Sequence, residues 1–146
     1  LPVHIFRLPG IYGPKKSILE KIKEKKVLII KKRGHVFSRI YVKDIAKCIM
    51  KSIKKITPGE IYNVSDDRPC SSEELILYAC KKMKLKKPSQ INFNDITISE
   101  MTKSFYKENK KVSNKKVKEL LDWNPDFRDY KEGLKDIFDI DDNIKI

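Results

Sequence analysis

Apolar and polar residues alternate along this chain in short blocks, which predict strands and helices in turn. The segment from residue 17 to residue 25 and the segment that ends at Pro58-Gly59 carry apolar residues at helical spacing. Four apolar or β-branched runs have the length of strands, at residues 3–7, 27–30, 36–42 and 61–64. Strands that alternate with helices favour an α/β fold.

Helices dominate the expected structure after residue 65. Ser71 and Glu74 have the spacing of a capping box, so a helix is expected to begin there and to end before Pro88. Residues 139–146 are expected to fray. Between these segments the pattern predicts one short extended piece and three helices, at residues 92–94, 99–106, 114–121 and 131–138.

The helix that begins near Asp44 has a regular apolar pattern. Ile45, Ile49 and Ile53 recur at every fourth position, which predicts one stripe that faces the core. Asp44 itself is expected to cap the helix or to place a negative charge at its start.

Length and composition fit a folded domain. The chain has 146 residues, of which 40% are apolar, and this is enough to bury a core. No apolar run approaches the roughly 18 residues of a membrane span. The sequence begins at Leu1 rather than Met, and its first residues already have the pattern of a buried strand. We therefore expect the chain to be cut from a longer protein.

The formal net charge of +13 at pH 7 first suggests nucleic acid as a partner. Only five of the 33 basic residues are arginine, however, and arginine makes the bidentate contacts to phosphates and guanines. The lysine runs, among them Lys110-Lys111, also lack the interleaved aromatic residues of a single-strand platform. The lysines are therefore expected mainly on solvated surfaces.

The cysteine and histidine residues do not suggest a disulfide framework or a metal site. Cys48, Cys70 and Cys80 are odd in number and form no CxxC pair, which favours a reducing cytoplasm. His4 and His35 are too few for a usual zinc site among such scattered cysteines.

A loop that contains proline and glycine follows the first predicted strand. Pro9 withholds a backbone N–H group, and Gly10 lets a ligand approach the backbone closely. In an open α/β sheet, ligands bind beyond the carboxyl ends of strands. The pattern by itself leaves two interpretations open, a tight turn or a ligand-binding loop.

Five short segments spread over most of the chain carry recognisable motifs. In one-letter code they are RLPGIYGP (7–14), VFSRIYVKDIA (36–46), IYNVSD (61–66), KVSNKK with LLDWNP (111–125) and YKEGL (130–134). In this order they resemble the C-terminal half of the NAD-dependent epimerase/dehydratase family, the extended short-chain dehydrogenases/reductases, and the pattern is closer to its atypical branch.

The resemblance implies the C-terminal part of a Rossmann-type NAD(P)-binding fold together with the small substrate-side α/β region. Residues 1–64 would form the last strands and helices of the Rossmann sheet, and residues 65–146 the mainly helical substrate-side region. The family's glycine fingerprint and catalytic Tyr-x-x-x-Lys belong to the N-terminal half, so no catalytic residue is expected here. Three pairs in this chain have the same spacing and are expected to be chance matches: Tyr12/Lys16, Tyr78/Lys82 and Tyr106/Lys110.

The resemblance also assigns binding roles to residues of this chain. Leu8, Pro9 and Gly10 would lie against the nicotinamide end of the cofactor, which would be NAD or NADP. Ile11 and Arg39 would border the substrate.

Two positions depart from the pattern of the nucleotide-sugar epimerases. Phe37 stands where those enzymes often have an arginine for the substrate diphosphate, and Arg39 stands where they usually have an aromatic residue. That phosphate contact therefore does not transfer, which puts a nucleotide-sugar substrate in doubt. Arg39 is expected either to bind an anion in the cleft or to form an ion pair with Asp44 or Asp66.

The main functional hypothesis is a cytoplasmic oxidoreductase that transfers hydride to or from NAD(P) and acts on a polar metabolite, such as a sugar derivative. The 146-residue chain alone is expected to be inactive. Two alternatives stay open: a non-catalytic NAD(P)-binding module of the same fold and, less favoured, a basic nucleic-acid-binding domain. No membrane and no metal are expected, and a homodimer stays open.

Overall fold

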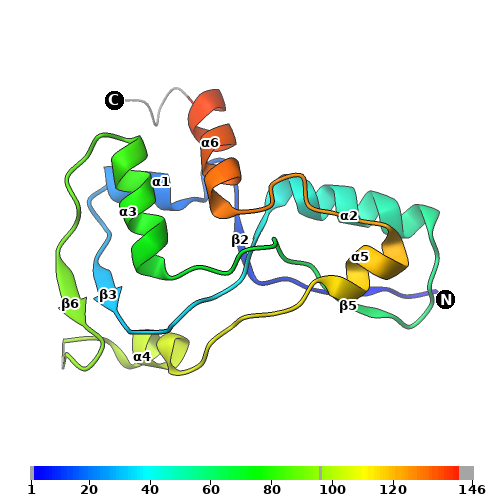
Figure 1. Cartoon of the computed structure of the whole chain (residues 1–146), viewed down its shortest axis with the longest axis horizontal. Coiled ribbons are helices and arrows are strands. Elements are labelled where there is room, and N and C mark those ends of the chain that lie inside the picture. Colours follow the sequence, from blue (N-terminus) through cyan, green and yellow to red (C-terminus); the bar gives the residue numbers. More distant parts are fainter. Residues whose placement is uncertain (1, 96, 142–146) are drawn as a thin grey trace.

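The computed structural model describes residues 2–95 and 97–141 of the chain and has an α/β architecture (Figure 1). The described residues form strands β1 (Ile5–Arg7), β2 (Gly10–Tyr12), β3 (Ile29–Lys31), β4 (Arg39–Tyr41), β5 (Ile61–Asn63) and β6 (Gln90–Asn92). They also form helices α1 (Ile18–Lys23), α2 (Val42–Lys54), α3 (Ser72–Lys82), α4 (Glu100–Lys107), α5 (Lys115–Leu121) and α6 (Tyr130–Ile140). Each element expected from the sequence is present, within a few residues of its predicted bounds.

The strands form three parallel pairs, β1 with β5, β2 with β4, and β3 with β6. One strand was not expected from the sequence, because the segment after Arg7 was interpreted as a loop. Residues 10–12 instead form β2, in which Gly10 pairs with Arg39 and Tyr12 with Tyr41. Proline and glycine make a strand difficult to predict here, because they are rare in strands. The strand forms through its pairing with a partner far along the chain.

Two hydrophobic cores lie on either side of the β2–β4 pair. One is built around Tyr62, Val117 and Trp123, and it holds β1 and β5 to α2 and α5. The other packs α1, α3 and α6 against β3 and β4. Figure 1 shows α2, α5 and β5 at one end of the molecule and α3, β3 and β6 at the other, with β2 between them. Because side chains alternate along a strand, β4 serves both cores: Ile40 belongs to the first and Tyr41 to the second.

The predicted core stripe on α2 is wrong for most of its length. Ile45 is half-buried against the first core, but Ile49 is 44% exposed and Ile53 is 66% exposed. The face that packs inward is formed by Asp44, Cys48 and Ser52. Helical spacing shows which residues share a face, but no other described segment covers the face of α2 that carries Ile49 and Ile53.

Asp44 places a negative charge in the first turn of α2, which is one of its two predicted roles, but it does not cap the helix. The N-cap residue of α2 is Tyr41, which makes no side-chain cap, and Asp44 lies in the first turn. Its carboxylate accepts hydrogen bonds from the backbone N–H groups of Asp126, at 2.8 Å, and Phe127, at 3.1 Å. Asp44 therefore ties α2 to the segment between α5 and α6.

Serine residues begin two of the predicted helices as expected. Ser17 caps α1 and forms a full capping box with Glu20. The Ser71 hydroxyl accepts from the backbone N–H of Glu74 at 3.0 Å, whereas the Glu74 carboxylate binds Arg68 and the Tyr130 hydroxyl. Helix α6 continues through Ile140, so the predicted fraying is wrong for residues 139 and 140, and residues 142–146 of that prediction lie outside the described part. None of the helices within residues 2–95 and 97–141 has the length and apolar character that a membrane span requires.

Candidate functional site

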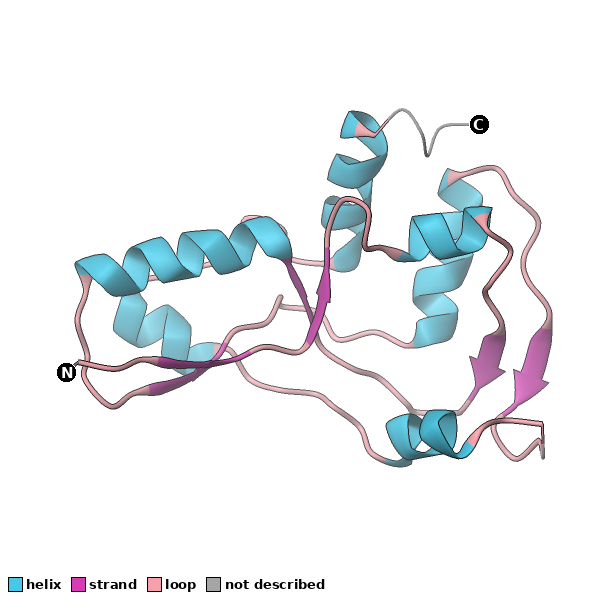
Figure 2. Ribbon diagram, turned by 180° about the vertical axis from the view of Figure 1, so that it is seen from behind, coloured by secondary structure: helices cyan, strands magenta, loops and turns pink. Residues whose placement is uncertain are grey.

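A cavity of about 500 Å³ lies beyond the carboxyl ends of β1 and β5. Arg7 and Asn63 are the last residues of these two strands, they pair with each other, and both line the cavity. Figure 2 shows β1 and β5 side by side, with β2 following β1 after a short loop. This is the place where open α/β sheets bind ligands.

Three of the residues expected to contact the cofactor line this cavity. Leu8 and Pro9 connect β1 to β2, Gly10 is the first residue of β2, and Leu8 is partly exposed. A Cβ atom added at Gly10 would lie 3.8 Å from the Arg39 Cγ atom and from the Ser38 carbonyl oxygen. This is ordinary contact, so the protein itself does not require glycine here. The open backbone surface fits a flat ligand that packs against the loop.

The opposite wall of the cavity comes from segments far along the chain. Phe37 and Phe105 pack edge to face with ring centroids 5.3 Å apart. The Asn109 side chain accepts from the backbone N–H of Val36 at 2.9 Å and donates to the Gly34 carbonyl at 3.2 Å. These bonds fix the segment after α4 alongside the segment before β4.

The cavity carries positive charge and no negative charge. Arg7, Lys110 and Lys111 line it, and no acidic residue does. In the part of the chain that the structure describes, none of these three cations forms an ion pair. Lys110 and Lys111 are exposed, as expected for the lysine runs, and Asn63 was not among the residues predicted for the site. Their position in the sequence could have identified Arg7 and Asn63, because both residues end predicted strands, and ligands bind beyond the carboxyl ends of parallel strands.

Arg39 is buried, with 5% of its surface exposed. Its Nη1 donates to the carbonyl oxygens of Phe37 and Cys70, both at 3.2 Å, and to the Cys70 thiol at 2.9 Å. The guanidinium also lies 3.8 Å from the centroid of the Phe37 ring. Over residues 2–95 and 97–141 it forms no ion pair with Asp44 or Asp66, and its Nη2 has no hydrogen-bond partner.

The two residues expected to border the substrate lie together, but in a second cavity. Ile11 and Arg39 line a smaller space of about 120 Å³, whose walls also include Tyr12 and Tyr130. Gly10 lines both cavities. The structure therefore brings all five predicted residues into one region, as two groups on either side of Gly10.

Asp66 is a buried carboxyl group next to Arg39. Its backbone N–H donates to the Arg39 carbonyl at 2.8 Å, and its side chain accepts from the Arg68 N–H at 3.3 Å. Burial raises the pKa of Asp66 to about 7, although the Arg68 N–H and the Arg39 charge both act against this shift.

This raised pKa predicts a pH-dependent stability. The unfolded chain releases the Asp66 proton near the ordinary pKa of 3.8, while the folded chain keeps it up to about 7. The free energy of unfolding should therefore fall as pH rises between these values, by about 4 kcal/mol at most from this group. Urea denaturation at pH 4 and pH 8 should show that Asp66→Asn removes most of the difference. An equally steep dependence in Asp66→Asn would contradict the assignment.

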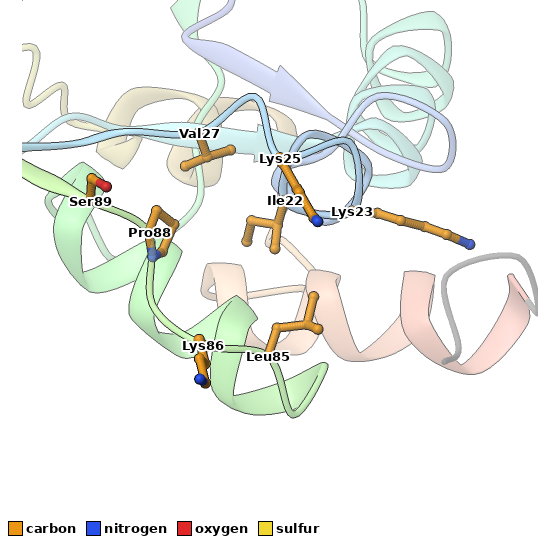
Figure 3. Close-up of a pocket in the computed structure, with 8 residues that line it drawn as sticks. All are labelled: Ile22, Lys23, Lys25, Val27, Leu85, Lys86, Pro88 and Ser89. Carbon is orange, nitrogen blue, oxygen red and sulfur yellow. The ribbon is translucent and has the colours of Figure 1, made fainter.

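A third cavity, of about 610 Å³, is distant from these residues. Figure 3 shows that Ile22, Val27, Leu85 and Pro88 supply its apolar lining, with lysine side chains near its rim. It lies where α1 and β3 meet the end of α3, and it contains none of the residues predicted for cofactor or substrate.

Comparison with solved structures shows the fold. A conserved protein of unknown function from Silicibacter pomeroyi superposes with a TM-score of 0.90 at 39% identity, over 95% of this chain and 49% of that chain. UDP-glucose 4-epimerase from Thermotoga maritima, solved with UDP-glucose, gives a TM-score of 0.73 at 19% identity, over 95% and 46%. dTDP-glucose 4,6-dehydratase from Bacillus anthracis, solved with NAD, gives 0.72 at 18% identity, over 95% and 44%.

This chain is a structural match to the NAD-dependent epimerase/dehydratase family. It spans about half the length of the solved chains that it matches. The epimerase/dehydratase match is one of fold, an α/β arrangement with parallel strands that is similar to part of these Rossmann-fold enzymes. No protein-family model matches the sequence, and no curated protein does.

Proposed function

We propose that this chain is the C-terminal half of an NAD(P)-dependent oxidoreductase of the epimerase/dehydratase family. The observation that carries the proposal is the cavity at the carboxyl ends of β1 and β5, with the loop of Leu8, Pro9 and Gly10 as one wall. The order of the five sequence motifs supports the assignment to the C-terminal half. Residues 1–64 would then complete the Rossmann sheet, and residues 65–146 would form the substrate side.

Exposed apolar surface supports a further half of the protein. β1 pairs only with β5 among the described strands, so one of its edges is free. Val3 and Ile5 are about half exposed, as are Ile49 and Met50 on α2. A free strand edge and an outward apolar face are features that proteins usually cover. In this proposal the N-terminal half adds the neighbouring strands and covers the exposed face.

The residues of this chain would bind and orient the reactants. When bound, the nicotinamide supplies the hydride or accepts it. Pro9 offers no N–H group, and Gly10 offers no side chain, so the loop presents a flat apolar surface to the ring. Ile11 and Arg39 would border a polar, sugar-type substrate beside it. The acid–base pair would come from the N-terminal half.

Gly10→Ala tests the proposal. The added methyl group meets only ordinary contacts within the chain, so the thermal midpoint should change little. It narrows the cavity, so the full-length protein should bind NADH or NADPH about tenfold more weakly, by a change of about 1.4 kcal/mol. Fluorescence titration of each cofactor measures this.

Met101→Ala is the control, because Met101 is 84% exposed on α4. Its affinity for the cofactor should equal that of the original protein. If the full-length protein bound neither NADH nor NADPH, the proposed function would be wrong. Equal affinity in Gly10→Ala would remove the loop from the cofactor site.

A further inference from the structure

A fourth cavity, of about 380 Å³, lies where helix α3 begins. Its lining includes Ser71, Ser72 and Glu73 at the start of this helix, the turn over residues 31–34, and His35. It shares no lining residue with the two cavities that carry the predicted cofactor and substrate residues. The proposed function therefore leaves this cavity unexplained.

The first turn of α3 borders the cavity with two unpaired backbone N–H groups. The Ser71 hydroxyl accepts the N–H of Glu74, the third residue of the helix. The N–H groups of Ser72 and Glu73 have no hydrogen-bond partner among the described residues. Free N–H groups at the start of this 11-residue helix, together with the helix dipole, attract an anion.

His35 brings a buried polar atom without a partner to the same cavity. Only 4% of the residue is exposed, and its ring stacks on Tyr106 with centroids 4.7 Å apart. Its Nε2 lies 3.0 Å from the Glu108 carbonyl oxygen, which can only accept, so Nε2 carries a hydrogen atom. Nδ1 has no partner within the part of the chain that the structure describes. In the imidazolium form Nδ1 is a donor, which an anion would satisfy.

The turn opposite α3 is fixed in place and leaves open space. The Lys32 ammonium donates to the Tyr106 carbonyl and lies 4.5 Å from the centroid of the Phe93 ring. Gly34 has a φ of +74°, and a Cβ atom built there meets nothing within 4 Å. Exposed lysines are frequent in this chain, so the charge of the turn does not by itself indicate a site. The helix start and His35 indicate it.

We propose that this cavity binds a tetrahedral oxyanion such as sulfate, held by the N–H groups of Ser72 and Glu73 and by His35 Nδ1. The inference goes beyond the proposed function, because none of these residues belongs to the cofactor or substrate groups. Several donors around one cavity suit an ion with several oxygen atoms, and hydrogen bonds to a charged acceptor are the stronger kind. The Glu73 carboxylate also lines the cavity and opposes the anion.

Binding of the anion should be coupled to a proton on His35. Burial lowers the pKa of the His35 imidazole, the hydrogen bond to the Glu108 carbonyl raises it, and the charges of Lys32 and Lys110 lower it further. The other charged groups that line the cavity are Lys31, Arg33 and Glu73. The ring is therefore mainly neutral near pH 7 without the ion. Because the bound anion stabilises the imidazolium, its affinity should rise as pH falls.

The test is isothermal titration calorimetry of the full-length protein with sodium sulfate at pH 6 and pH 8. Sulfate keeps its charge over this range, so a change in affinity reports protons bound by the protein. The original protein should bind sulfate about tenfold more tightly at pH 6 than at pH 8. His35→Gln cannot take up this proton, so its affinity should be the same at both pH values.

Ser72→Pro removes one of the two N–H groups and keeps the helix. Proline is favoured at the first helical position, and Ser71 has the extended backbone, with φ −72° and ψ 161°, that a residue before proline requires. Sulfate affinity at pH 6 should fall about fivefold, with little change in the thermal midpoint. This variant tests the site even if His35→Gln fails to fold.

Ser72→Ala is the matched control, because it loses only the hydroxyl group and keeps the N–H. Its sulfate affinity should equal that of the original protein. Glu73→Gln keeps its backbone N–H and removes the acidic charge from the lining, so it should bind sulfate more tightly.

Four results would overturn the inference. The original protein could fail to bind sulfate at pH 6, or Ser72→Pro and Ser72→Ala could bind it equally. His35→Gln could keep the full pH dependence, or saturating NADH could displace sulfate, which would place the ion in the cofactor site. Sulfate binding that depends on Ser72 and His35, in a protein that binds neither NADH nor NADPH, would instead remove the proposed function and leave the anion site.

Discussion

Asp44→Ala should lower the free energy of unfolding by about 2–4 kcal/mol. The Asp44 carboxylate is fully buried and accepts the backbone N–H groups of Asp126 and Phe127. Alanine would leave both donors without their partner at the place where α2 meets the segment before α6. The backbone carbonyl of Asp44 also accepts the Trp123 Nε1–H at 3.2 Å, so loosening this segment should disturb the indole.

Urea denaturation followed by the fluorescence of Trp123, the single tryptophan of the sequence, measures this effect. The free energy of unfolding of Asp44→Asn should lie between those of the original protein and Asp44→Ala, because an amide oxygen can still accept one of the two hydrogen bonds. Asp126→Ala is the control. It keeps the backbone N–H that binds Asp44, and among the described residues the Asp126 side chain forms only an exposed ion pair with Lys47, so its loss should cost less than about 1 kcal/mol. Equal stability of Asp44→Ala and Asp126→Ala would contradict the role of Asp44.

Gly133→Ala should destabilise the protein by about 1–3 kcal/mol, although alanine is the better helix former. Gly133 lies within α6, where a Cβ atom would stand 2.2 Å from the Tyr12 hydroxyl oxygen and 2.7 Å from two ring carbons. Tyr12 cannot move away easily, because β2 is paired with β4 and the Tyr12 ring packs on Tyr41 with centroids 5.2 Å apart.

A double-mutant cycle isolates this contact. Tyr12→Leu removes the atoms that would clash, so adding Gly133→Ala in that background should be neutral or stabilising by about 1 kcal/mol. Lys135→Ala, at an exposed position of the same helix, is the control and should change stability by less than about 0.5 kcal/mol. A stabilising effect of Gly133→Ala in the original protein would show that propensity outweighs the contact with Tyr12.

Local sequence signals predicted most of the secondary structure. Ser17 and Ser71 mark helix starts because their hydroxyl groups satisfy backbone N–H groups at the first turn, a requirement that depends on near neighbours only. The strand over residues 10–12 was missed because nothing local favours it, and it exists through its pairing with β4. Ile49 and Ile53 were predicted to face the core but are exposed, since their spacing shows that they share a helix face and not whether another segment covers that face.

The residues of the candidate site also fall into two groups, those predicted from local sequence and those brought together by distant segments. Leu8, Pro9 and Gly10 were predicted, because a strand that ends in a proline-glycine loop is visible in the sequence and resembles a family motif. Arg7 and Asn63 meet because β1 and β5 are parallel and in register. Lys110 and Lys111 reach the same cavity because the segment after α4 bonds to the segment before β4.

Local sequence patterns were enough to predict the order of helices and strands, the proline-glycine loop and the family that the motifs resemble. Packing between distant segments set the features that these patterns did not predict: Arg39 is buried against Cys70, Asp44 binds a distant loop, and Arg7, Lys110 and Lys111 line one cavity. The difference is the sequence separation of the interacting residues. Backbone geometry and capping are set by residues within one or two turns, whereas burial and charge depend on which distant segments pack together.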